Sequence, residues 1–193
     1  MVLVDTSVWI DFLRGRNLEH VKALQQLLDS NQIVVTTPTI VQEILQGANS
    51  RANQNILWRW FSKLACMAPS NMLTCSIEAA RLFLECRLRG QTPRSSNDCL
   101  IAYIAIEHNL LLLHNDRDFD AIDESHAQLV RHETRRRQAG EVIVVGQRQH
   151  IHAIRHCPPS KLRRGQETIR ADRMTMKIAV EHVRRIGNGN NRT

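Results

Sequence analysis

The sequence predicts an α/β fold, in which a parallel β-sheet carries helices on both faces and is followed by a poorly ordered basic C-terminal extension. Short apolar runs typical of buried strands alternate with amphipathic segments typical of helices. Residues 1–130 hold 11 Lys and Arg against 14 Asp and Glu, whereas residues 131–193 hold 15 against 5. We therefore expect one domain over residues 1–130 and a loosely ordered extension over residues 131–193.

The expected strands are short and almost entirely apolar. Val2 to Asp5, Ile33 to Val35 and Leu110 to Leu113 have the composition of strands buried on both faces. Ala127 to Val130 fits one more short strand, and Val142 to Val145 is an isolated apolar run within the extension.

The expected helices begin at capping residues and end at glycines. Thr37 and Pro38 predict a helix start, and Gly90 predicts a helix end. Apolar spacing of three and four residues predicts helices over residues 8–14, 18–28, 38–47, 57–64, 76–89 and 98–108. Within the helix over 76–89, we expect four side chains to face inward, those of Ile77, Ala80, Leu84 and Leu88.

Four acidic residues stand where strands run into helices. Asp5 ends the first strand, Asp116 follows the strand over 110–113, and Glu43 and Asp98 lie early in their helices. In an open parallel sheet, strand C-termini and the following helix N-termini meet at one crevice. Carboxylates gathered there repel one another unless a cation lies among them, and oxygen ligands favour Mg²⁺ or Mn²⁺. The pattern predicts a metal-dependent nuclease acting on phosphodiesters.

Each acid also has a simpler interpretation when it is taken alone. Asp98 fits a helix cap and Asp5 fits a surface acid at a strand end. Asp116 fits a turn residue that bonds its own backbone. Asp118 fits a helix cap or an ion-pairing acid better than a metal ligand, and Asp11 is expected at the surface.

Four motifs together resemble the PIN-domain ribonucleases, and more narrowly the VapC-type toxins of bacterial toxin–antitoxin pairs. They are Val4 to Asp11, Glu43 in its Thr-Pro context, Asn97 to Ala102, and Leu113 to Phe119. The resemblance covers residues 1 to about 130, in order and at family spacing. The extension departs from the family, whose members end near the strand expected at 127–130.

The resemblance implies an Mg²⁺- or Mn²⁺-dependent endoribonuclease whose catalytic acids are Asp5, Glu43, Asp98 and Asp116. Asp5 and Asp98 would bind the metal, because a hard cation accepts one or two carboxylates and keeps several waters. Glu43 and Asp116 would orient those waters or hold a second ion. Secondary roles fall to Ser7, which would fix the loop after Asp5, and to Asn97, which would contact phosphate or cap its helix; Asp118 is a further secondary candidate.

The resemblance also implies partners. We expect RNA as substrate, a cognate antitoxin lying in a groove near an exposed Trp9 or Trp58, and a homodimer. No apolar run approaches the roughly 20 residues that span a bilayer, and the start of the chain does not resemble a secretion signal. Five scattered cysteines fit free thiols in a reducing cytoplasm.

Rival functions remain open. A housekeeping RNA-processing nuclease and a catalytically idle protein that binds RNA or antitoxin both fit the motifs. A phosphoacceptor signalling domain fits poorly, because Asp5 has no adjacent acid and no Lys lies between Lys63 and Lys161. In the extension, His150, His152, His156 and Cys157 match no zinc spacing. The extension either adds RNA affinity or has no function, and the absence of aromatic residues after Phe119 favours the second.

Overall fold

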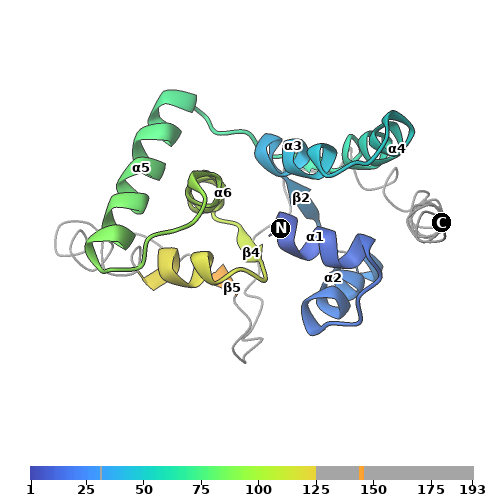
Figure 1. Cartoon of the computed structure of the whole chain (residues 1–193), viewed down its shortest axis with the longest axis horizontal. Coiled ribbons are helices and arrows are strands. Elements are labelled where there is room, and N and C mark those ends of the chain that lie inside the picture. Colours follow the sequence, from blue (N-terminus) through green and yellow to red (C-terminus); the bar gives the residue numbers. More distant parts are fainter. Residues whose placement is uncertain (31, 125–143, 146–193) are drawn as a thin grey trace.

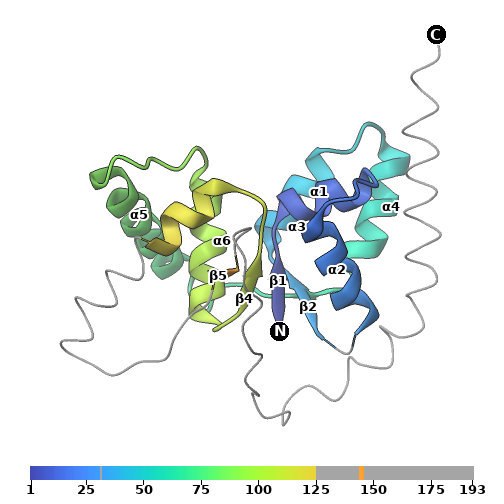
Figure 2. The ribbon, with the colours of Figure 1, turned by 90° about the horizontal axis from the view of Figure 1, so that it is seen from below.

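A computed structural model describes residues 1–30, 32–124 and 144–145. Its sheet has five parallel strands in the order β3-β2-β1-β4-β5. Figure 2 shows β2, β1 and β4 side by side. The strand bounds are β1 Val2–Val4, β2 Val34–Thr36, β3 Ala65–Cys66, β4 Leu111–Leu113 and β5 Val144–Val145.

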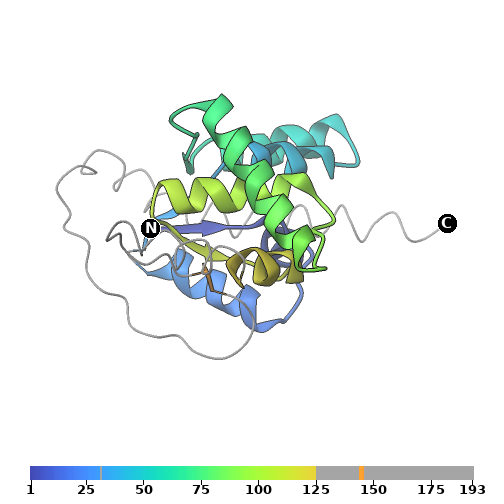
Figure 3. The same ribbon diagram turned by 90° about the vertical axis from the view of Figure 1, so that its left-hand side faces the viewer.

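Helices cover both faces of the sheet, as predicted. Figure 3 shows α6 and α5 beyond one face and α2 beyond the other. Figure 1 shows α3 beside α4. The bounds are α1 Thr6–Leu13, α2 Glu19–Asp29, α3 Pro38–Gln46, α4 Arg51–Phe61, α5 Met72–Leu88 and α6 Ser96–Glu107, and a further helix covers residues 117–124. Among the described residues, no helix has the length and apolar character needed to cross a bilayer.

The central strands explain why the acids meet. β1 lies between β2 and β4, all three run parallel, and their side chains are buried almost throughout. The chain leaves β1 toward β2 on one side and returns as β4 on the other, which makes the C-terminal edge of β1 and β4 a topological switch point. Helix α6 precedes β4 and ends in a turn at Asn109, whose φ of 51° is left-handed. The N-terminus of α6 therefore lies at the same edge.

The buried face of α5 differs from the prediction. The helix begins at Met72, four residues before the expected start, because the Asn71 side chain accepts a hydrogen bond from the Thr74 peptide N–H. Its buried residues are Cys75, Ala79, Leu82 and Cys86. The predicted inward set lies outward instead, since Ile77, Ala80, Leu84 and Leu88 are all exposed.

Three other helices also begin earlier than expected. Helix α4 covers Arg51–Phe61 instead of residues 57–64, because the Ser50 side chain caps it by accepting a hydrogen bond from the Asn53 peptide N–H. Asp5 itself caps α1, which begins at Thr6, and Ser95 caps α6, which begins at Ser96. Asp98 therefore lies inside the first turn of α6 and is not its cap.

The fifth strand comes from beyond residue 130. Val144–Val145 pairs with Leu112 and Leu113 of β4, so a domain ending at residue 130 would lack this strand. The strand expected at 127–130, the loose order of the extension and the His150 to Cys157 group lie outside the described residues, and the domain boundary stays a prediction.

Candidate active site

Asp5 is held at the end of β1 by hydrogen bonds from Ser7. The Ser7 peptide N–H and Oγ donate to Asp5 Oδ2 at 2.8 and 2.6 Å. Ser7 Oγ in turn accepts from the peptide N–H of Asn115 at 3.0 Å, so one hydroxyl links the ends of β1 and β4. Ser7 therefore makes the kind of hydrogen bond that was predicted for it, one that fixes the chain just after Asp5. Asp5 is 4% exposed, and burial raises its pKa against the lowering effect of Ser7.

Glu43 reaches the same edge from α3. Its carboxylate accepts hydrogen bonds from the Thr6 hydroxyl and from Asn97 Nδ2, the latter at 2.8 Å. Asn97 lies beside Asp98 at the start of α6, so Glu43 ties α3 to both α1 and α6. Asn97 therefore positions Glu43 and does not cap its helix.

Asp98 has an unusually high pKa because it lies partly buried among other acids. Desolvation and the nearby charges of Asp5, Asp116, Asp118 and Glu43 raise the pKa of Asp98 to about 7. The sequence predicts that Asp5, Glu43 and Asp116 lie near Asp98, and the charge of each contributes to the raised pKa of Asp98, as does the charge of Asp118.

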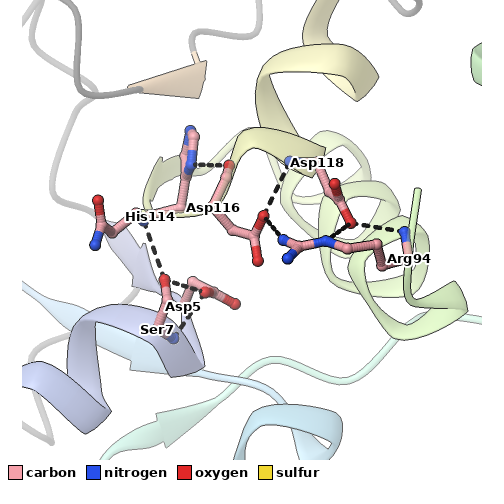
Figure 4. A network of polar contacts seen from close by, with 7 residues as sticks. Asp5, Ser7, Arg94, His114, Asp116 and Asp118 are labelled. Atoms are coloured by element: carbon pink, nitrogen blue, oxygen red, sulfur yellow. Dashed lines mark hydrogen bonds and ion pairs between the residues drawn. The ribbon is translucent and has the colours of Figure 1, made fainter. Parts of the chain in front are cut away.

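Asp116 and Asp118 form the far side of the cluster with Arg94, as Figure 4 shows. The Asp118 peptide N–H donates to Asp116 Oδ1 at 3.1 Å, which is the turn-type bond considered for Asp116. Arg94 Nε donates to Asp118 Oδ2 at 3.2 Å, and its Nη2 pairs with Asp116. Asp118 is therefore an ion-pairing acid in this structure.

Histidine 114 supports the turn that carries Asp116. Its Nδ1 lies 3.0 Å from the Asp116 carbonyl oxygen (Figure 4), and its ring packs on Phe119. Burial lowers the pKa of His114, which favours the neutral ring. This residue holds the loop behind the acids.

The prediction of a surface position for Asp11 is wrong. Asp11 is 5% exposed and binds Arg16 Nη1 at 2.9 Å and His20 Nε2 at 2.8 Å. Asn115 Nδ2 lies 3.4 Å from the same carboxylate. Asp11 points from α1 into the gap that α2 and the loop after β4 close, where a buried charge needs partners.

The donor set suits a hard divalent cation held by few protein ligands. The clustered groups are carboxylates, which Mg²⁺ and Mn²⁺ prefer. Among the described residues, no group of three or more His, Cys, Asp or Glu side chains is gathered as a ligand set. Asp5 and Asp98 stay the predicted ligands, since a hard cation can be bound by one or two carboxylates while it keeps most of its water.

A second feature is an apolar groove between α3 and α4. It has a volume of about 760 Å³, and its apolar lining includes Val41, Leu45, Trp58, Phe61 and Leu64. Trp58 is 52% exposed, whereas Trp9 is buried between Phe12 and Phe61. Of the two tryptophans considered for a partner groove, Trp58 alone is exposed.

Comparison with known proteins identifies the family. The model of the PIN domain matches residues 2–125. The chain belongs to the PIN-domain family. Its fold, a parallel sheet with helices on both faces and the acids at one strand edge, is the fold expected from the resemblance.

Within the PIN-domain family, this chain is similar to VapC ribonucleases. VapC ribonuclease Mb1587 of Mycobacterium bovis and ribonuclease VapC11 of Mycobacterium tuberculosis are each 34% identical to this chain over 124 residues, covering 63% of the chain and 91% of the relative. They confirm the resemblance to VapC-type PIN proteins. The solved structure of FitAB bound to an IR36 DNA fragment is 19% identical, with a TM-score of 0.52, and the match covers 79% of this chain and all of that one. This likeness concerns the fold alone.

Sequence reasoning missed two side chains of the site. Thr6 and Arg94 both bind predicted acids, but Thr6 is separated from Glu43 by 37 residues and Arg94 from Asp116 by 22. No short sequence pattern predicts contacts between residues so far apart. The sequence does place Arg94 four residues before Asp98, which indicates only that Arg94 lies near the site.

Proposed function

We propose that this chain is a divalent-metal-dependent endoribonuclease of the VapC type, the toxin of a toxin–antitoxin pair. The observation that carries the proposal is that Asp5, Glu43, Asp98 and Asp116 lie at one strand edge, where burial first and the neighbouring acids second raise the pKa of Asp98 to about 7. A site that disfavours its own negative charge is suited to a cation. The family and its ribonuclease relatives support RNA as the substrate.

The side chains divide the work between ligation and positioning. Asp5 and Asp98 would hold Mg²⁺ or Mn²⁺, which when bound lowers the pKa of a water and neutralises phosphate charge. Ser7 fixes the Asp5 carboxylate. Asn97 and Thr6 leave Glu43 aimed into the cluster, where it can accept a hydrogen bond from a water.

Metal-dependent cleavage by the purified full chain tests the proposal. We expect single-stranded RNA to be cut with Mg²⁺ or Mn²⁺, cutting to stop with EDTA, and Asp5→Asn or Asp98→Asn to lower the rate at least about a hundredfold. Asp120→Asn is the matched control, because Asp120 is an exposed acid of the helix over 117–124. Wild-type cutting by Asp98→Asn, or metal-independent cutting, would contradict the assignment. A folded, inert wild type would favour the idle binding protein.

We propose the groove between α3 and α4 as the antitoxin site, since an exposed Trp beside an apolar groove is typical of an interface. An apolar segment of the antitoxin would lie across Trp58. Coexpression with the product of a small gene immediately upstream tests this, and Trp58→Ala should weaken the complex at least about tenfold. The absence of such a gene would favour the housekeeping nuclease.

The remaining expectations concern assembly and location. A homodimer would use the exposed apolar face of α5, which carries Leu73, Ile77, Leu84 and Leu88. Cys66, Cys75 and Cys99 are free thiols, which is compatible with our proposal of a cytoplasmic site of action.

A further inference from the structure

Arg94 is fixed against two acids of the site from both its backbone and its side chain. It lies in the loop between α5 and α6, four residues before Asp98. Its peptide N–H donates to Asp118 Oδ2 at 2.7 Å, and its Nε donates to the same oxygen at 3.2 Å. Its Nη2 pairs with Asp116 Oδ1, so the guanidinium lies across both carboxylates (Figure 4).

The pairing has little to do with the stability of the fold. The Arg94 side chain is 68% exposed, and exposed ion pairs contribute little to folding. The peptide bond to Asp118 already anchors the loop. What the side chain adds is a positive charge at the edge of the carboxylate cluster that solvent, and therefore a nucleic acid, can reach.

The groups that compensate the acids divide the cluster into two halves. Asp5 has the neutral donors of Ser7, whereas Asp116 and Asp118 have Arg94. Within the described part of the chain, Arg94 is the one Lys or Arg in an ion pair with a site acid. One half therefore carries a built-in cation, and the Asp5–Asp98 half does not.

In nucleases with two metal ions, the two cations lie about 4 Å apart and clamp the phosphate from both sides. We propose that Arg94 takes the place of the second cation: the site binds one divalent ion at Asp5 and Asp98, and the guanidinium binds the substrate phosphate from the side of Asp116 and Asp118. A guanidinium suits that role, because its planar N–H groups match phosphate oxygens and it is always charged. The inference rests on the proposed nuclease function.

The number of ions bound per chain tests the first half of this inference without RNA. Titration of the full chain with Mn²⁺, followed by electron paramagnetic resonance and calorimetry, should give one ion per wild-type chain. Arg94→Ala exposes Asp116 and Asp118 to metal and should bind a second ion, with the spin coupling of a close pair. Arg94→Lys keeps the charge and should bind one ion. Arg117→Ala, which removes an exposed neighbouring charge, should also bind one.

Two results overturn the stoichiometry: two ions bound by the wild type, or one ion bound by a folded Arg94→Ala chain with unchanged affinity. A melting curve for each variant establishes folding. If the ion counts are as expected but RNA stays intact, the nuclease proposal fails and the place of Arg94 stands. If the wild type binds two ions and cuts RNA, the proposed role of Arg94 fails and the nuclease proposal stands.

RNA binding tests the second half. In an Asp98→Asn background, Arg94→Ala should weaken binding of a single-stranded oligoribonucleotide about tenfold and lower the salt slope of log Kd by about 0.7, as for one lost phosphate contact. Arg94→Lys should keep the slope but lose part of the affinity. An unchanged slope in Arg94→Ala, or an equal loss in Arg117→Ala, would overturn phosphate binding by Arg94.

Discussion

The site carboxylates differ in the groups that balance their charge. Asp5 receives two hydrogen bonds from Ser7, and Asp116 faces Arg94. Among the described residues, no hydrogen bond reaches the Asp98 carboxylate, and its neighbours are acids. The ionised form of Asp98 therefore lowers the free energy of unfolding of the metal-free chain, and the size of this loss depends on pH.

Asp98→Asn should stabilise the metal-free protein, and more at pH 8 than at pH 5. The folded pKa of about 7 lies above the ordinary 3.8, so the folded state holds the proton more tightly. The stability this provides is complete below about pH 4 and is lost as pH rises through 7. A shift of this size corresponds to about 4 kcal/mol, and partial exposure reduces the expected gain to about 1–2 kcal/mol. Urea unfolding in EDTA measures the gain at both pH values. A gain at pH 8 that is no larger than the gain at pH 5 would show that the charge of Asp98 does not destabilise the fold.

The buried network of Asp11 connects the fold to the site. Asp11 holds His20 of α2, and Asn115 reaches both Asp11 and, through its peptide N–H, Ser7. Asp11→Asn should cost about 2–4 kcal/mol of unfolding free energy, since His20 keeps its burial but loses the carboxylate. Arg16→Ala, which removes a half-exposed partner of the same acid, should cost less than about 1 kcal/mol. Thermal unfolding compares the two variants. Similar losses of stability would mean that Asp11 stabilises the fold mainly through its ion pair with Arg16 and not through His20.

At the scale of elements, α5 shows where periodicity fails to fix orientation. The helix is apolar on two sides: Cys75, Ala79, Leu82 and Cys86 are buried on the side that packs on α6, whereas the exposed surface carries Met72, Leu73, Ile77, Leu84 and Leu88. Spacing in the sequence identifies both sets equally, and only packing chooses between them. The acids of the site were predictable because each follows a strand or opens a helix, which fixes its edge of the sheet. The partners of Asp11 and Arg94 depend on contacts that no local pattern encodes.

The exposed face of α5 is nearly symmetric about its midpoint and therefore suits a second copy. In an antiparallel pair of α5 helices, Leu73 would face Leu88 of the other copy and Ile77 would face Leu84, with the small Ala80 near the axis. Ile77→Glu together with Leu84→Glu should convert a dimer into a monomer with little loss of stability. Sedimentation analysis measures this, and Trp58→Ala, at the separate groove, is the control. A wild-type monomer, or a dimer that survives the double change, would exclude α5 as the interface.

The whole molecule combines an acidic PIN domain with a basic remainder. The acids of the site all lie before residue 131, where acidic residues outnumber basic ones, and the excess of Lys and Arg lies after it. The sheet nevertheless takes β5 from Val144–Val145, beyond the composition change. A boundary based on charge alone therefore separates the predicted catalytic acids from one strand of their sheet.

Two truncations should distinguish the contribution of β5 from that of the basic charge. A chain ending after residue 150 keeps β5 and should retain metal-dependent cutting, because every site acid and its partners remain. A chain ending after Val130 leaves the outer edge of β4 without β5, so its melting temperature should fall by several degrees while the acids stay in place. If Lys and Arg after residue 150 touch phosphates, the chain that ends after residue 150 should show a salt slope of log Kd for RNA that is lower by about 0.7 per lost contact.

Melting curves, cutting rates and salt titrations of the full chain and the two truncated chains provide the comparison. A folded chain of 150 residues that responds to metal but cuts no RNA would place part of the nuclease beyond that point.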